Sequence, residues 1–237
     1  VFLLAGIVPV LVWPKEPSSE EQPHTAMSAH MLMERCRAPR RAVEFWKAFA
    51  SRSLVSAGVG LTTMFLWFIA SALIFRDWFT QGNSSPIAVP VCSLIASMAL
   101  ATLVGSVGAA FIAGPVGEYI EDPRYLSVIS CVLYTVALAL PMTMSSAVSM
   151  VLFALIGGFA FGLIDTFGQL LAMGALPDAR SAGHDLAFFN LSNSVGLALA
   201  AIIGAVGVAV TGGFSVLFPA AIVCVLASAV VTISMKR

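Results

Sequence analysis

The chain has 237 residues, of which 59% are hydrophobic and only 10% are charged, and its net charge at pH 7 is zero. Soluble domains carry roughly 25% charged residues, so this composition indicates an all-α integral membrane protein. A net charge of zero gives no basis for a nucleic-acid partner. The four cysteines have no metal-ligand or redox spacing, and we expect neither a metal site nor a cofactor.

Six apolar runs are long enough to cross a bilayer as helices, which takes about 20 residues. They lie at 47–75, 89–113, 125–141, 147–174, 185–210 and 214–235. The opening run, 1–13, is too short to span, and we expect it to be the end of a truncated transmembrane helix. Segment 14–46 begins acidic and ends basic, and we interpret it as a central loop that precedes a six-helix bundle over 47–237.

The distribution of Lys and Arg predicts the orientation, because these residues favour the cytoplasmic side. If the loop 14–46 is cytoplasmic, eleven of the twelve Lys and Arg residues fall on that side and only Arg76 does not. The sequence therefore predicts a multi-pass protein of the plasma membrane with a cytoplasmic C-terminus.

Small residues recur every four positions in several of the apolar runs. Ala154, Gly158 and Gly162 form one such stripe, and Gly105 with Ala109 forms another. Helices in lipid associate through close backbone approach, which small residues at this spacing allow. The stripes predict a packed bundle rather than separate anchors.

The segment IAGPVGEYIEDPRYL, 112–126, resembles the cytoplasmic loop motif of the major facilitator superfamily, G-x-L-x-D-R-x-G-R-R. The matching positions are Gly114, Val116, Glu118 and, more loosely, Arg124. Tyr119 and Glu121 depart from the motif. An acid at a helix exit can pair with a basic group in one conformational state only, so Gly114, Glu118 and Arg124 are candidates for a cytoplasmic gate. The alternative is a solvated turn that simply ends the helix.

A longer segment, 161–200, is similar to the tenth and eleventh helices of bacterial superfamily members of the glycoside/sugar–cation symporter type. Those proteins have an intramembrane Asp, a Leu-Pro exit and a D-L-G-x-x-N-x-A-N pattern that opens the next helix. The matching residues here are Asp165, Leu176, Pro177, Asp185, Leu186, Asn190 and Asn193. Ala187 replaces the usual Gly, and His184 replaces a usual Lys or Arg.

The resemblance implies the C-terminal six-helix half of a twelve-helix transporter. In that fold each half consists of two inverted three-helix repeats, and the substrate binds between the halves near the midplane. The partner bundle would be supplied in cis by an N-terminal half or in trans by a second copy of the chain.

Asp165 is the candidate with the clearest physical argument. It lies twelve residues before Pro177, about 18 Å at 1.5 Å per residue, which is close to the bilayer centre. Gly158, Gly162, Asp165 and Gln169 share one helical face, which places the acid on the packed side. Burial favours the neutral carboxyl, and such a group is a natural proton carrier.

Two interpretations of Asp165 stay open at this point. With Gln169 it could carry the coupled proton or bind a substrate hydroxyl, since intramembrane acids are functional by default. Alternatively, Thr166, Gln169 or a facing Asn satisfies it internally.

The remaining candidates lie around the next helix. Asn190 and Asn193 could bind a polyol or bridge two helices. Arg180 and Asp185 could form state-dependent pairs with the loop motif, or could serve as a charge anchor and an acid at a helix N-terminus.

We therefore expect a proton-coupled secondary active transporter for a small organic solute such as a sugar, working by alternating access. Its partners would be lipid, the solute and H⁺. An enzyme is not expected, because no paired acids and no phosphate-binding loop occur, and no catalytic residue is assigned. The alternatives are multidrug or metabolite efflux in the same fold and a non-transporting half-size membrane scaffold.

Overall fold

The computed structural model describes residues 43–72, 88–120, 122–144, 146–174 and 182–235. Its helices are α3 (Val43–Thr63), α5 (Ala88–Tyr119), α6 (Pro123–Thr143), α7 (Ala147–Gly174), α8 (Ala182–Thr211) and α9 (Leu217–Ile233), with the 3-10 turn η4 (Phe214–Val216) before α9. No strand occurs within these ranges, so the expected all-α class is confirmed there. The expected segment 1–13 and most of the loop 14–46 lie outside the described residues.

Five of these helices, α5 to α9, are long and apolar enough to cross a membrane. A sixth span is obtained if α3 is joined to the short helix Leu66–Ala72, from which it is bent by 41°. The chain is thus a multi-pass membrane protein by the length and composition of its helices. The expected first span, 47–75, is broken rather than continuous.

Two neighbouring threonines at the break after α3 bind the same backbone carbonyl. The hydroxyl groups of Thr62 and Thr63 both donate to the backbone carbonyl of Val59, at 2.9 and 3.0 Å. Threonine hydroxyls that bind a carbonyl of the preceding turn compete with the helical ladder and bend helices. The hydropathy of the run does not register this competition.

The junction between α5 and α6 also differs from the expected loop 112–126. The helix α5 continues through Pro115 to Tyr119, and α6 begins at Pro123. Asp122 caps α6 by accepting from the backbone amide of Arg124 at 3.1 Å, and a proline at the first helical position suits such a start. A proline near a helix end removes a single ladder bond, and α5 runs past Gly114 and Pro115 without ending there.

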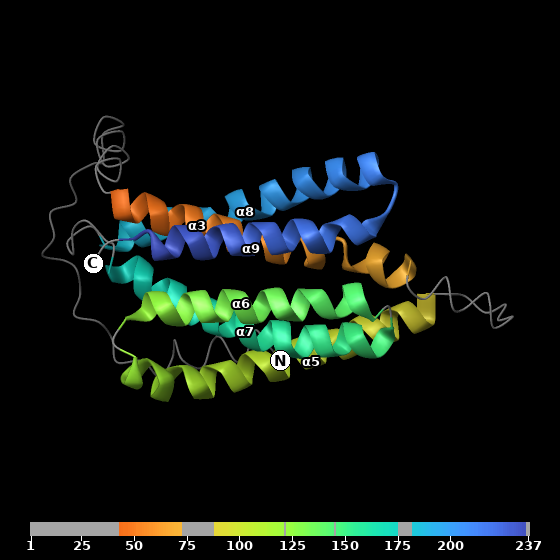
Figure 1. Cartoon of the computed structure of the whole chain (residues 1–237), viewed down its shortest axis with the longest axis horizontal. Coiled ribbons are helices and arrows are strands. Elements are labelled where there is room, and N and C mark those ends of the chain that lie inside the picture. Colours follow the sequence, from red (N-terminus) through yellow and green to blue (C-terminus); the bar gives the residue numbers. More distant parts are fainter. Residues whose placement is uncertain (1–42, 73–87, 121, 145, 175–181, 236–237) are drawn as a thin grey trace, which may run out of the picture. The chain divides into compact units, whose positions relative to one another are not determined.

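The helices form two groups of three that lie side by side (Figure 1). The first group consists of α3, α8 and α9, and the second of α5, α6 and α7. The groups meet mainly where α6 packs against α9, and more weakly where α3 approaches α7. Each group therefore contains the first helix of one half of the chain and two later helices of the other half.

This exchange of helices has an approximate twofold symmetry. Let α3 correspond to α7, α5 to α8, and α6 to α9. The packing of α3 on α8 then corresponds to that of α7 on α5. The packing of α3 on α9 corresponds in the same way to that of α7 on α6. If α3 and Leu66–Ala72 together count as one span, each unit has three spans, and two consecutive units then cross a membrane in opposite directions, as in an inverted repeat.

Two close helix crossings without room for a side chain hold these pairs together. A Cβ on Gly105 of α5 would lie 2.2 Å from the carbonyl oxygen of Leu155 on α7, and one on Gly158 would lie 2.6 Å from that of Thr102. At the equivalent crossing of α8 and α3, a Cβ on Gly196 would lie 2.4 Å from the carbonyl oxygen of Ser53. The stripes of small residues in α5 and α7 are thus confirmed as packing surfaces.

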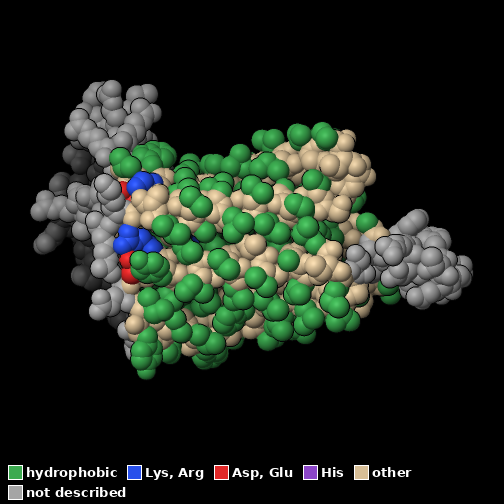
Figure 2. All heavy atoms as spheres, viewed as in Figure 1, with side chains coloured by type: hydrophobic (Ala, Val, Ile, Leu, Met, Phe, Trp, Pro, Cys, Tyr) green, Lys and Arg blue, Asp and Glu red, His purple; other side chains and the backbone are tan. Residues whose placement is uncertain are grey.

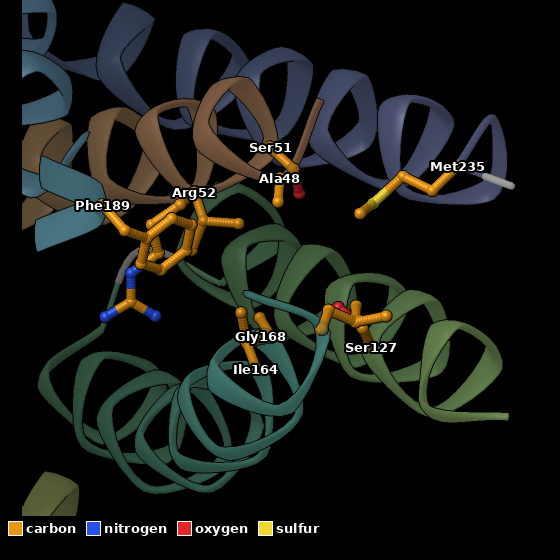
Figure 3. A pocket seen from close by; sticks show the side chains of 10 residues that line it. Ala48, Ser51, Arg52, Ser127, Ile164, Gly168, Phe189 and Met235 are labelled. Atoms are coloured by element: carbon orange, nitrogen blue, oxygen red, sulfur yellow. The ribbon is translucent and has the colours of Figure 1, made fainter. Parts of the chain in front are cut away.

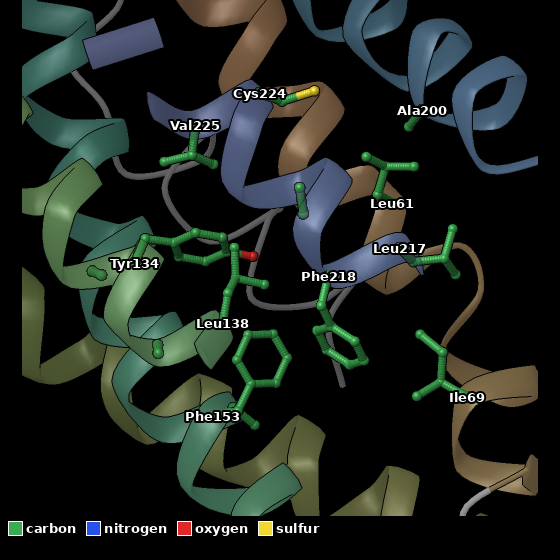
Figure 4. Packing of buried hydrophobic residues seen from close by; sticks show 14 of the residues in the cluster. Leu61, Ile69, Tyr134, Leu138, Phe153, Ala200, Leu217, Phe218, Cys224 and Val225 are labelled. Carbon is green, nitrogen blue, oxygen red and sulfur yellow. The ribbon is translucent and has the colours of Figure 1, made fainter. Parts of the chain in front are cut away.

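An aromatic cluster fills the junction between the two groups. The ring of Phe153 on α7 meets Tyr134 on α6 edge to face, with centroids 6.4 Å apart, and Phe218 on α9 at 6.2 Å. Figure 4 shows these three rings facing one another between α6, α7 and α9. Edge-to-face pairs at such distances are favourable, so the rings stabilise the contact between the groups.

The glycine crossing makes a direct prediction for stability. Gly105→Ala forces α5 and α7 apart, because the new methyl group would overlap backbone atoms. We expect the free energy of unfolding to fall by about 1–3 kcal/mol, the usual range for overpacking. Unfolding of the purified protein by denaturant in detergent micelles measures it.

Gly114→Ala on the same helix is the matched control, because no atom lies within 4 Å of the added Cβ. We expect it to be neutral or to stabilise by up to about 1 kcal/mol through helix propensity. Equal stability of the two variants would contradict the close crossing.

Candidate functional site

The charged side chains that the structure describes gather at one end of the helices. Figure 2 shows blue and red atoms at this end of the visible face, whereas the rest of that face is apolar or uncharged. The described charged side chains form three ion pairs: Glu44 with Lys47, Asp122 with Arg124, and Arg52 with Asp165. The first two pairs lie at the helix ends, and the third lies within the bundle.

The two pairs at the helix ends bind the C-terminus of α9. Lys47 on α3 donates to the carbonyl oxygen of Ser234 at 2.6 Å, and Arg124 on α6 donates to that of Met235. Cations at a helix C-terminus satisfy the last carbonyls and the helix dipole. Arg124, expected to be part of a gate, thus holds α6 to α9, with Asp122 as its acidic partner.

The third pair joins the two groups of helices. A terminal nitrogen of Arg52 on α3 donates to Oδ1 of Asp165 on α7, and the amide of Gln169 donates to Oδ2 at 3.0 Å. The side chain of Arg52 is 11% exposed, and that of Asp165 is 34% exposed. Both carboxylate oxygens therefore act as acceptors, as in an ionised carboxylate.

The depth of this pair follows from the helix positions. Arg52 is the tenth residue of α3, and Asp165 is the tenth from the end of α7. Nine residues of helix measure about 14 Å, so Asp165 lies well inside the apolar length of α7, whereas Arg52 lies five residues, about 7.5 Å, beyond Lys47 at the charged start of α3. A charge at such a depth is costly unless it is paired or faces a cavity, and here each residue supplies the other's counter-charge.

A small cavity lies beside the pair. Its walls include Arg52 from α3, Ser127 from α6 and Gly168 from α7, and its volume of about 20 Å³ is enough for one water molecule (Figure 3). Nη1 of Arg52 is buried and has no hydrogen-bond partner within the described part of the chain. The guanidinium group thus keeps donor capacity beyond its bond to Asp165.

The two expected asparagines of α8 have different surroundings. Asn193 bridges α8 to α3, because the hydroxyl of Ser56 donates to its Oδ1 at 2.6 Å. The side chain of Asn190 is exposed. The bridging role left open for this pair thus holds for Asn193, and substrate contact by Asn190 stays a prediction.

Exposed polar side chains occur on both α7 and α8. Thr166 and Gln169 on α7 and Asn190 and Ser194 on α8 are all exposed, although each lies in a helix long and apolar enough to span a membrane. Polar groups at membrane depth avoid lipid and face a bundle interior or water. These four residues are called the polar face below.

The remaining gate candidates are less well placed by the structure. Gly114 is an open position in α5. Glu118 and Asp185 lie in α5 and α8, but their side chains are outside the described residues, as is the whole of Arg180. Their gating role stays a prediction. Among the described residues, no three His, Cys, Asp or Glu side chains are grouped to hold a metal ion.

Sequence reasoning missed Arg52 as a site residue and grouped it with the cytoplasmic charges. The available signal was its position, because Arg52 lies five residues, about one and a half helical turns, beyond Lys47 inside an apolar run. An intramembrane cation, like an intramembrane acid, requires a partner.

A comparison of the chain with models of known protein families, with curated proteins and with solved structures finds no match. The resemblance to the major facilitator superfamily therefore stands on the sequence motifs described above.

Measurements of the free energy of unfolding can show whether Arg52 and Asp165 are energetically coupled. Asp165→Asn leaves the guanidinium of Arg52 unpaired inside the bundle, and we expect a loss of about 2 kcal/mol, less than for a fully buried pair because Asp165 is partly exposed. The double variant Arg52→Gln, Asp165→Asn removes both charges and should recover at least half of this loss. Denaturant unfolding in micelles measures both.

Glu44→Gln is the control, because it neutralises an acid of a more exposed pair and should change stability by less than about 1 kcal/mol. A double variant no more stable than Asp165→Asn would show that the two residues are not coupled.

Proposed function

We propose that the chain is part of a proton-coupled secondary transporter for a small uncharged organic solute, in which Asp165 carries the proton. The observation that carries this proposal is the Arg52–Asp165 pair, which joins the two groups of helices at membrane depth. The symmetric exchange of helices and the resemblance of 112–126 and 161–200 to the major facilitator superfamily support it.

The proposed mechanism uses the proton to break the ion pair. Proton binding to Asp165 removes its negative charge and turns one of its acceptor oxygens into an O–H donor. Arg52 has only N–H donors and cannot accept a hydrogen bond from this O–H. The attraction between α3 and α7 is then lost at this point, and these two helices have few other contacts. The pair thus connects the two groups of helices, and proton binding breaks this connection, as alternating access requires.

The polar face supports the presence of a second wall to the transport pathway. A single bundle lines only one side of a pathway, and the exposed polar groups of α7 and α8 are unsuited to lipid. In the proposed transporter a second bundle, from the same polypeptide or from a second copy, covers this face. The solute and the proton pass between the two bundles.

The second candidate function is a non-transporting membrane scaffold. It is favoured by one observation, the internal satisfaction of Asp165 by Arg52 and Gln169. In a scaffold the pair would only hold the helices together, and Asp165 would take up no proton.

Transport by the charge-neutral double variant distinguishes the two functions. In vesicles with an imposed pH gradient we expect wild-type protein to accumulate a radiolabelled solute from a panel of sugars, glycosides and aromatic alcohols. Arg52→Gln, Asp165→Asn should lose this accumulation at least about tenfold, because it has no carboxyl to carry the proton. Exchange of internal for external solute should persist.

The folded state of the double variant is checked in the same preparation by its unfolding midpoint. Accumulation by this variant at the wild-type rate would reject proton coupling through Asp165. A wild-type protein that accumulates no solute of the panel in either vesicle orientation would favour the scaffold.

A further inference from the structure

A larger cleft lies outside the ion pair, between α3, α5, α6 and α7. Its volume is about 350 Å³, within the range of sites that hold small organic ligands. Its wall contains three aromatic rings, from Tyr134 on α6 and from Phe153 and Phe161 on α7, together with Met98 on α5. No sequence motif pointed to this cleft.

The lining of the cleft excludes charged and highly hydroxylated ligands. None of the side chains around it is ionisable at neutral pH, so an ion would lose its hydration without a counter-charge. Its polar side chains are three threonines and one tyrosine, which are too few to satisfy every hydroxyl of a sugar. The aromatic and aliphatic walls instead suit the faces of a flat apolar group.

The threonine hydroxyls that line the cleft donate to carbonyls of their own helices and keep lone pairs that can accept a hydrogen bond. Thr63 and Thr102 donate to the backbone carbonyls of Val59 and Met98, at 3.0 and 2.9 Å. Thr62 also donates to the carbonyl of Val59, at 2.9 Å. A threonine oxygen whose proton is engaged keeps lone pairs, so Thr63 and Thr102 can receive a hydrogen bond from a ligand.

The cleft is adjacent to the proposed proton site. Phe161, in its wall, precedes Asp165 by one turn of α7, which is about 6 Å along the helix. Val59, also in its wall, lies two turns beyond Arg52 on α3. A ligand in the cleft would therefore lie between the same two helices that the ion pair connects.

We propose that this cleft binds an uncharged aromatic molecule of one or two fused rings that carries a hydroxyl or N–H donor. The rings pack against the aromatic wall, and the donor binds Thr63 or Thr102. That this molecule is the transported solute rests on the proposed function, whereas its binding follows from the cleft alone. A lipid chain, the other apolar candidate, has no donor for these oxygens.

Binding of [³H]tryptophol to the full chain in lipid nanodiscs tests this proposal. Tryptophol is uncharged and combines an indole ring with N–H and O–H donors. We expect saturable binding that an excess of D-glucose does not displace, because glucose has donors but no aromatic ring.

Two pairs of variants localise the binding. Ala99→Trp places a large ring at an exposed position of the cleft wall and should weaken binding at least about tenfold, whereas Ala110→Trp, exposed on the same helix outside the cleft, should not. Thr102→Val removes one acceptor with little change of shape and should weaken binding about fivefold. Thr143→Val, which removes a similarly bonded hydroxyl outside the cleft, should have no effect.

Three outcomes would overturn the proposal. Tryptophol uptake that rises with lipid content and never saturates would mean simple partition into lipid. Displacement by D-glucose would indicate a polyol site, and equal affinities of Ala99→Trp, Thr102→Val and wild type would place binding elsewhere. Because binding requires no proton gradient, it can succeed where transport through Asp165 fails, so the two proposals fail separately.

Discussion

A charge at membrane depth has to be paired or hydrated, and Arg52 and Asp165 meet this requirement with each other. The constraint acts across the structure because the two residues belong to different groups of helices. Removing either charge leaves the other without its partner, so the pair can persist only while α3 and α7 stay close. Their remaining contact is small, which makes this interaction the main determinant of their separation at this depth.

The other contacts described above hold the helices that surround this ion pair. The glycine crossings hold α5 to α7 and α3 to α8 without room for a side chain between their backbones. Lys47 and Arg124 bind α9 to its neighbours at the helix ends. The ion pair and the aromatic cleft both lie between α3 and α7, one turn apart along α7 and two turns apart along α3. A proton at the pair and a ligand in the cleft would therefore act on the same two helices.

The sequence predicted those features that depend on local pattern. The bounds of α7 agree with the expected run 147–174, and the glycines of the stripe lie on the face that packs against α5, because hydropathy and small-residue spacing are local. Gln169, expected on the same packed face, is exposed, and Asp165 is partly exposed. The partner of Asp165 was not predictable from pattern, since Arg52 is 113 positions away and meets it only through the fold. The break after Thr63 was missed because hydropathy does not register hydroxyls that compete for a carbonyl. The cleft was missed because its wall comes from four helices.

The central claim, that Asp165 binds and releases a proton within the folded bundle, can be measured by infrared difference spectroscopy in liposomes. Spectra of wild type and Asp165→Asn, each recorded on stepwise acidification, isolate the carbonyl band of the protonated Asp165 carboxyl. The account predicts that this band appears reversibly, while the amide bands of the helices stay unchanged. A band that appears only together with loss of helix would contradict it, because the carboxyl would then gain its proton only when the bundle unfolds.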